Sequence, residues 1–323
     1  HILEALPLKE LINAAFTCKL WMSAAAVICR SKDPIDIGEQ FTQYIAKDTS
    51  IPLHALTRFV SEFCLVKEDI IHGLEEFCLE GRMDIIRWMY DTFEITDEDL
   101  RVHAYLLLRF ACMRGHTEVA KWLHAKVNFT TSDICKHNCM VLQSACLNNS
   151  IETAEWLVTT FDITKKAACI NNCHILEVIC INGHLENAKW FIEEFDITAE
   201  DIDAKQDEIL QSICERGHLE LLILVSSKIL ANRLSTCLIG RMICSASDAG
   251  HIDILKWIVS TFKPTDKMLH VDSGLSLTRA CMNGHLELAQ WMCQTFDLVK
   301  WVNSNPYSKN CILTNSAGEG RFE

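Results

Sequence analysis

The sequence lacks two features that would point to a membrane or to nucleic acid. It has no apolar run long enough to cross a bilayer, which takes about 18–20 residues; the nearest approach, residues 221–225 with Ile229 and Leu230, is broken by polar residues. It also lacks a basic excess, because 30 Lys and Arg stand against 43 Asp and Glu and give a net charge of −13. A protein that binds nucleic acid through its phosphates needs a basic surface. We therefore expect neither a membrane nor a nucleic-acid partner.

Signatures of catalysis are missing as well. We find no His-Glu-x-x-His, no phosphate-binding Gly-Lys-Ser/Thr loop, no Gly-x-Ser-x-Gly and no Gly-x-Gly-x-x-Gly. The glycine-containing segment at residues 316–320 is more typical of a flexible tail than of a phosphate loop. We therefore expect no enzymatic activity, no catalytic residues, no bound metal and no cofactor.

The sequence does contain one glycine-turn pattern that repeats along most of its length. Steps of 33 or 34 residues separate successive copies, and such a period is typical of stacked helical units. It predicts an all-α helical repeat solenoid of about seven recognisable units rather than a single globular core. The turn position is occupied in order by Gly81, Gly115, Asn149, Gly183, Gly217, Gly250 and Gly284.

Each unit contains the pattern of two amphipathic helices. Before the turn, an apolar residue and a small residue stand four apart, as Leu176 and Cys180 do, and so share one face of a first helix. After the turn, every unit has an acid such as Glu186 in the first turn of a second helix, where the helix dipole favours negative charge. This placement explains the acids better than a row of catalytic or metal-binding carboxylates.

Tryptophan also recurs at one position of the second helix. We expect these side chains to form the core between units, and a ladder for stacking ligands is the alternative reading. The unit at Gly217 departs from the pattern, because Leu224 replaces the tryptophan, and we expect the weakest joint there. The recurring residues are Trp88, Trp122, Trp156, Trp190, Trp257 and Trp291.

Two further signals mark the ends of the helices. In five units His follows the turn glycine, as in Gly115-His116, and we expect this His to make a local hydrogen bond rather than to bind metal or transfer protons. The second helix is followed by Phe, an acid, Ile and Thr at residues 93–96, 161–164 and 195–198. The spacings Thr96 to Asp99, Thr130 to Asp133 and Thr198 to Asp201 resemble helix N-caps, so a new helical turn is predicted after each Thr.

These residues resemble the ankyrin repeat, with the match running from the small residue through Gly-His into the second helix, as at residues 111–116. The form Gly-His-Leu-Glu-x-Ala-x-Trp followed by Phe-Asp-Ile-Thr is most similar to the divergent ankyrin-like repeats of large DNA viruses that infect protists. The resemblance covers about residues 65–300. The family's opening Thr-Pro-Leu-His is reduced to its Leu, as at Leu142, and Phe replaces the glycine before the hairpin. The hairpin fingers of the family are therefore in doubt, with short helical turns as the alternative.

We divide the chain into three parts. Residues 66–300 form the ankyrin-like solenoid, and residues 301–323 form a C-terminal cap and flexible tail. Residues 1–65 are either degenerate capping repeats or the remnant of an F-box, because Cys18, Lys19 and Trp21 are similar to the later part of that motif. The chain begins with His1 rather than Met, so we expect a fragment whose true N-terminus lies upstream.

The 17 cysteines would suggest a disulfide framework in a small secreted protein. Six of them fall on the small-residue position of the first helix, which instead predicts core thiols. Free core thiols indicate a reducing, intracellular compartment such as the cytoplasm. If the source is viral, we expect the cytoplasm of the host cell. Cys135 and Cys139 stand 34 residues before Cys169 and Cys173. Stacked units lie roughly 8–10 Å apart, whereas zinc needs sulfurs about 2.3 Å away, so paired core cysteines are favoured over a metal site.

The repeat predicts an extended surface, which favours a non-enzymatic scaffold that binds another protein as a monomer. The resemblance implies host proteins as partners. The alternative is the substrate-recognition subunit of a ubiquitin ligase, which depends on the F-box-like segment. In ankyrin-like proteins the stretch between the Thr of one unit and the first-helix Leu of the next lines the groove, and here it does not repeat. The candidate protein-binding residues in it are Glu98, Arg101, Thr131, Asp133, Lys165, Lys166, Glu200, Asp203 and Lys267.

Overall fold

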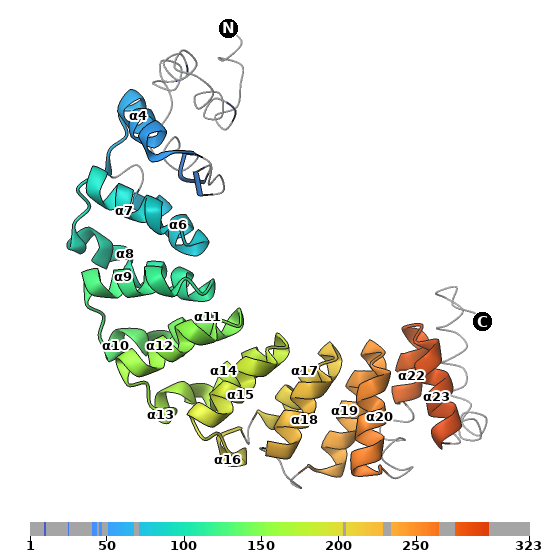
Figure 1. Cartoon of the computed structure of the whole chain (residues 1–323). Helices are drawn as coiled ribbons and strands as arrows, with labels where there is room; N and C mark the ends of the chain where they lie inside the picture. Colours follow the sequence, from blue (N-terminus) through green and yellow to red (C-terminus); the bar gives the residue numbers. More distant parts are fainter. Residues whose placement is uncertain are drawn as a thin grey trace. The chain divides into compact units, whose positions relative to one another are not determined.

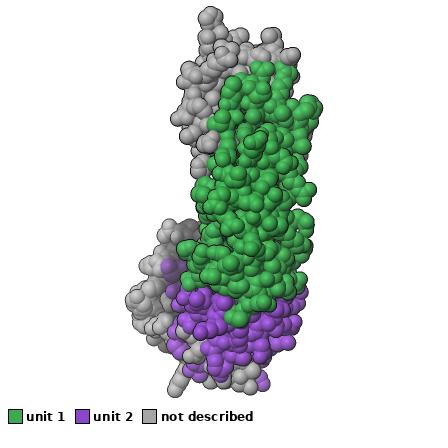
Figure 2. Space-filling view, turned by 90° about the vertical axis from the view of Figure 1, so that its left-hand side faces the viewer, with its two compact units in different colours: residues 1–164 green, residues 165–323 purple. Residues whose placement is uncertain are grey.

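The computed structural model describes residues 51–67, 71–202, 205–228, 234–264 and 275–296, together with isolated positions before residue 51. The chain divides into two compact units, residues 1–164 and residues 165–323, which are coloured separately in Figure 2. Within the described ranges both units consist of helices and contain no strand. The all-α architecture that the period predicts is therefore confirmed.

In the unit of residues 1–164, each repeat pairs a first helix with a second helix across the glycine turn (Figure 1). Each first helix packs on the next one and on its own second helix. The first helices are α6 (Leu74–Glu80), α8 (Asp97–Met113) and α11 (Lys136–Leu147), and the second helices are α7 (Met83–Thr92), α9 (Thr117–Val127) and α12 (Ile151–Phe161). They are preceded by α4 (Leu53–Phe63), which contacts α7, and by the short turn η2 (Ile71–Gly73).

The unit of residues 165–323 repeats the same arrangement. Its first helices again pack one on the next, and each contacts the second helix of its own repeat. The first helices are α14 (Ile170–Ile181), α17 (Gln206–Arg216), α19 (Thr236–Ala249) and α22 (Leu275–Met282), and the second helices are α15 (Leu185–Glu194), α18 (Leu219–Lys228), α20 (Ile252–Phe262) and α23 (Leu286–Phe296).

The core of each repeat contains the first-helix positions that the sequence marks. Leu108 and Leu142 are fully buried, and so is the small residue four positions after each, Cys112 and Cys146. Burial raises the pKa of these thiols, to about 12 at Cys146. The thiols are therefore protonated at neutral pH and act as small apolar side chains.

The tryptophans do not form the core that we expected. All six are half-buried, whereas the next residue along each second helix is largely or fully buried, as Phe191 is beside Trp190. Trp190 packs against Phe195 of its own repeat, with ring centroids 6.2 Å apart, and Trp122 packs edge-on against Tyr90 of the preceding repeat at 5.5 Å. Consecutive helical residues point about 100° apart, so only one of the two adjacent positions faces the centre of the interface.

The Phe-Asp-Ile-Thr segment ends one repeat. Its second residue is left-handed, with φ of 47° at Asp162 and 44° at Asp196, a conformation that Asp tolerates better than most residues. The following isoleucines, Ile163 and Ile197, are buried, and each donates its amide to the carbonyl oxygen five residues earlier. This is the pattern of a helix C-terminal cap followed by an apolar contact.

The threonine then begins a helical turn, so short helical turns stand where the family has hairpin fingers. The turns are α10 (Thr131–Ile134), α13 (Lys165–Ala168) and α16 (Ala199–Ile202), while α8 continues without a break. Thr96 and Thr130 each form a capping box, in which the threonine hydroxyl accepts the amide of Asp99 or Asp133 and the aspartate accepts the threonine amide. The N-caps predicted at these two threonines are confirmed.

A left-handed turn interrupts α11 and α14 at equivalent positions. Residues 137–139 and 171–173 have φ values between 51° and 61°. Each non-glycine residue in this conformation costs roughly 1–2 kcal/mol, although asparagine is better tolerated. Asn138, Asn171 and Asn172 occupy such positions, and each turn ends on a buried cysteine, Cys139 or Cys173.

The histidine after the turn contacts the preceding repeat instead of bonding locally as we expected. His116 donates from Nε2 to the carbonyl oxygen of Leu79 at 3.0 Å. The same bond recurs from His251 to Glu215 and from His285 to Asp248. A Cβ on Gly81, which has φ of 69°, would stand 2.4 Å from His116 Nδ1. The turn at Gly81 therefore needs glycine for space as well as for conformation.

Several sequence predictions fall outside the described residues. Among them are the F-box-like Cys18, Lys19 and Trp21, the whole of residues 301–323, and the candidate binding residues Asp203 and Lys267. The three-part division at residues 65 and 300, and the ubiquitin-ligase alternative, stay predictions. None of the helices in the described ranges is both long enough and apolar enough to span a membrane.

Candidate functional site

Helix α8 leaves one of its faces open. The helix spans 17 residues and packs against α6, α9 and α11. On its open side, Val102 is 76% exposed and Leu106, one turn later, is 39% exposed. Arg101 and Tyr105 directly precede these two residues along the helix; Arg101 is exposed and Tyr105 is half-buried. We call Arg101, Val102, Tyr105 and Leu106 the α8 face; it combines apolar and cationic groups within two turns.

A hollow of about 320 Å³ adjoins the α8 face. Val127 and Phe129 in it are buried, and Arg101 and Lys136 each carry a positive charge. Its volume lies at the lower end of the roughly 300–1,000 Å³ that is common for ligand pockets. The lining residues are Arg101, Ala104, Tyr105, Val127, Asn128, Phe129, Thr130, Asp133 and Lys136.

The acid in the hollow is tied to local structure. Asp133 accepts hydrogen bonds from Lys136 Nζ at 2.7 Å, from the Thr130 hydroxyl at 2.7 Å and from the Thr130 amide at 3.0 Å. The hydrogen bond from Lys136 and those from Thr130 lower the pKa of Asp133 to about 2. The carboxylate is therefore ionised throughout the neutral range, and its lone pairs are largely occupied by the helix cap.

The cation and the phenol on the α8 face are held more loosely. Arg101 Nε lies 3.7 Å from the exposed Glu98 carboxylate, and exposed pairs of this kind contribute little to stability. The Tyr105 hydroxyl is 3.5 Å from the Lys136 carbonyl oxygen, and its ring packs edge-on to His137 at 5.3 Å. Burial raises the pKa of Tyr105, so its hydroxyl stays protonated at neutral pH. Both side chains can meet a partner without breaking a strong internal bond.

Some of the predicted binding residues have contacts that join neighbouring repeats. The Thr131 hydroxyl donates to the Phe161 carbonyl oxygen at 2.9 Å. In the unit of residues 165–323, Lys165 donates to the Asp196 carbonyl oxygen at 2.6 Å and pairs with Asp201 at 2.7 Å. These contacts fix the short helical turns against the next repeat.

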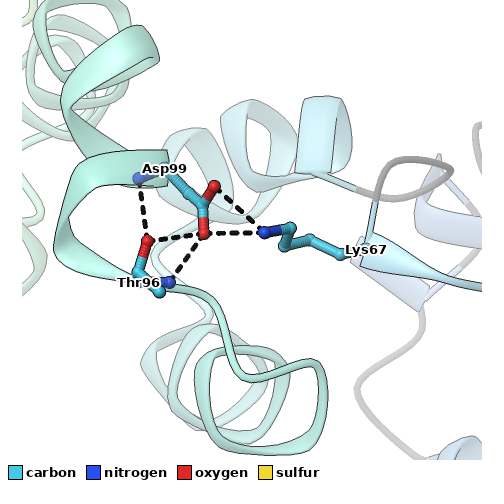
Figure 3. Close-up of polar contacts among 3 residues, drawn as sticks. All are labelled: Lys67, Thr96 and Asp99. Carbon is cyan, nitrogen blue, oxygen red and sulfur yellow. Dashed lines mark hydrogen bonds and ion pairs between the residues drawn. The ribbon is translucent and has the colours of Figure 1, made fainter.

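An equivalent lysine contact occurs in the unit of residues 1–164 (Figure 3). Lys67 Nζ lies 3.0 and 2.9 Å from the two carboxylate oxygens of Asp99, which also closes the capping box of Thr96. In both units a lysine of one repeat therefore neutralises the capping aspartate of the next. The sequence spacing differs, since Lys67 precedes Asp99 by 32 residues whereas Lys165 precedes Asp201 by 36, and this hides the equivalence in the sequence.

The structure thus distributes the nine predicted binding residues unevenly. Arg101 and Asp133 line the hollow, while Lys166 and Glu200 are exposed in the other unit. Sequence reasoning missed the exposure of Val102 and Leu106. The signal for them was present, because residues 104–108 with Val102 contain more apolar side chains than one buried face of a helix needs.

The four cysteines considered for zinc are not accompanied by further ligands. Cys139 and Cys173 are buried, and Cys135 and Cys169 are half-buried. Within the described ranges, no three His, Cys, Asp or Glu side chains come together in a way that would hold a metal ion.

Comparison with known proteins bears on residues 108–158, which match a family model described as ankyrin repeats in many copies. The matched stretch begins within α8 and ends within α12, so it contains the turns at Gly115 and Asn149 and borders the α8 face. A search among curated proteins gives no match. Residues 108–158 are thus similar to ankyrin repeats, and the stacked helix pairs of both units have an ankyrin-like arrangement.

Proposed function

We propose that the chain is a non-enzymatic scaffold that binds another protein through the α8 face and the adjoining hollow. Ankyrin repeats generally serve as protein-interaction modules. The observation that carries the proposal is the exposure of Val102 and Leu106 on a helix packed on its other sides, next to Arg101. Apolar surface rimmed by polar groups is typical of an interaction site.

The cysteines support a reducing compartment such as the cytoplasm. The described cysteines are free thiols, and those of the first helices, such as Cys112 and Cys180, are core residues that need no bridge. We propose that the protein works there as a monomer. The resemblance to viral repeats supports a host protein as its partner.

The α8 face is tested by affinity capture from cells with the full chain. Leu106→Asp places a charge in the apolar patch, and Ile223→Asp on α18 is the matched control because both residues are 39% exposed. We expect Leu106→Asp to lose partners that wild type and Ile223→Asp both retain, with unchanged helicity and urea midpoint. Equal capture by all three chains would contradict the proposed surface.

We propose a separate candidate surface among the charged residues of the unit of residues 165–323. Lys166 and Glu200 are exposed, and reversing such charges usually shifts stability by less than about 0.5 kcal/mol. The double variant Lys166→Glu with Glu200→Lys is therefore expected to weaken partner capture without changing the melting temperature. Intact capture, together with loss of capture when outer residues of the second helices are changed, would place the binding surface elsewhere.

A further inference from the structure

Two pairs of cysteines have no part in the proposed binding surface. In each pair, Cys135 with Cys139 and Cys169 with Cys173, the first thiol is half-buried and the second is buried. The Cys173 amide donates to the Cys169 carbonyl oxygen at 3.1 Å, and the Cys139 amide donates to that of Cys135 at 3.4 Å. Each left-handed turn therefore closes on its own two cysteines.

The turn also brings the side chains of Cys169 and Cys173 together, with their thiols in hydrogen-bonding contact. The hydrogen bond from Cys173 lowers the pKa of Cys169; the positive charge of Lys165 acts in the same direction, while burial and Asp201 oppose it. The same hydrogen bond and burial raise the pKa of Cys173. The half-exposed thiol is thus the one that ionises, and the buried thiol keeps its proton.

We propose that Cys169 and Cys173 form a peroxide-reactive dithiol, in which Cys169 attacks and Cys173 resolves. The Cys169 thiolate attacks one oxygen of hydrogen peroxide, so that an S–O bond forms and the O–O bond breaks. The departing hydroxide takes up a proton and becomes water. The sulfur has then given two electrons to the peroxide and is a sulfenic acid.

In the second step the Cys173 sulfur attacks the Cys169 sulfenic sulfur. An S–S bond forms as the S–O bond breaks, and the hydroxyl group leaves as water with the proton of the Cys173 thiol. The reaction is an oxidation of two thiols by one peroxide. The two cysteines belong to one turn, which the backbone hydrogen bond between them closes, so the bridge forms within that turn.

The backbone around this pair is strained, as it is around Cys135 and Cys139. Asn171, Asn172 and Cys173 are left-handed in succession, with φ of 55°, 55° and 56°. Such strain persists only where surrounding structure imposes it, and it concentrates at functional positions. Here the strained turn holds the resolving thiol beneath the attacking one, at the junction of α13 and α14.

The chain offers controls that separate this geometry from simple exposure. Cys64 and Cys237 are exposed, more so than Cys169. If access alone decided reactivity, they would oxidise first. A thiol becomes reactive through its thiolate fraction, so the proposal predicts that Cys169 oxidises several-fold faster than either.

The test uses the full chain, reduced, freed of reductant and exposed to hydrogen peroxide near neutral pH, then alkylated and digested with trypsin. Cys169, Cys173 and Cys180 lie in one tryptic peptide, residues 167–189. Mass spectrometry is expected to show that this peptide loses two hydrogen atoms, with fragmentation placing the bridge between Cys169 and Cys173. A bridge to Cys180, or oxidation of Cys64 and Cys237 before Cys169, would overturn the proposal.

Removing the resolving thiol provides the second test. In Cys173→Ser the bridge is lost, and we expect dimedone labelling of a sulfenic acid at Cys169 to rise several-fold. Cys180→Ser, which changes a buried thiol of the same peptide, is expected to leave the bridge intact. Absence of sulfenic labelling in folded Cys173→Ser would refute the attacking role of Cys169. If that variant fails to fold, the wild-type peptide map alone decides.

Discussion

Any side chain at the turn residue Gly81 would enter the space that His116 of the next repeat occupies. An alanine at Gly81 would adopt φ of 69°, at a cost of roughly 1–2 kcal/mol, and would place its Cβ 2.4 Å from the imidazole. We expect Gly81→Ala to cost less stability in a His116→Ala background than in wild type, with a coupling of about 0.5–3 kcal/mol. Urea unfolding of the four proteins measures it, and equal costs in both backgrounds would exclude the steric conflict.

The half-buried tryptophans lead to a different order of mutational effects from the one that their periodicity suggests. Phe191 is fully buried, so Phe191→Ala is expected to cost about 3–5 kcal/mol, as large core truncations do. Trp190→Ala removes a side chain that is only half-buried and is expected to cost less. The two urea midpoints decide the order; if Trp190→Ala is the more damaging change, the tryptophans belong to the core after all.

For single residues, the repeat period predicts which positions recur but not every contact that they make. The period identifies the recurring positions, and the burial of Leu108 and Cys112 follows from it. It does not say which of two adjacent apolar positions, Trp190 or Phe191, faces the neighbouring helix. Nor does it identify the partner of His116, because a backbone carbonyl group leaves no mark in the sequence.

At the scale of the helix, the capping box of α8 has a titratable member. The Thr96 amide and hydroxyl, and then Lys67, lower the pKa of Asp99 to about 2 (Figure 3). An unfolded aspartate has a pKa of about 3.9. The folded value is the lower one, so this contribution to stability is complete above about pH 4 and is lost as the pH falls toward 2.

We therefore expect Asp99→Asn to be less stable than wild type near neutral pH, and the difference in urea midpoint to shrink as the pH falls from about 5 to about 2. Glu98→Gln, in the same helical turn but exposed and only weakly paired, is the control and should change the midpoint little. A difference between Asp99→Asn and wild type that stays constant with pH would mean that the carboxylate charge is not what stabilises the cap.

The connecting elements were only partly predictable. The spacing of Thr and Asp gives the N-caps at Thr96 and Thr130, because both partners of a capping box lie within one turn. The left-handed turns at residues 137–139 and 171–173 were missed, although the asparagines in them are a signal for that conformation. The lysine contacts of Lys67 and Lys165 join different repeats, and their unequal spacing gives no periodic pattern.

At the scale of the molecule, stability in a repeat protein depends on contacts between neighbouring units. The unit at Gly217 has Leu224 where the others have tryptophan, and it lacks the Phe-Asp-Ile-Thr segment. We expect hydrogen exchange to show reduced protection there, with the repeats at Gly250 and Gly284 opening separately from those before them. Uniform protection over residues 74–292 would contradict a weak joint.

The period determines the repeat architecture, but it says little about where a partner binds. Glu98, Arg101 and Lys166 were predicted as binding residues because they break the period. Thr131 and Lys165 were predicted on the same ground, and they have contacts within the protein. Val102 and Leu106 were missed because an apolar residue in a helix is normally assigned to the core. Exposure in the folded chain is what separates these groups.

The central claim, that the α8 face binds a protein partner, is tested most directly by hydroxyl-radical footprinting. The full chain is labelled alone and in complex with a partner that wild type captures and Leu106→Asp does not. We predict that labelling of Val102, Tyr105 and Leu106 falls in the complex while labelling of Ile223 is unchanged. Unchanged labelling of the α8 face, with protection confined to the second helices, would contradict the claim.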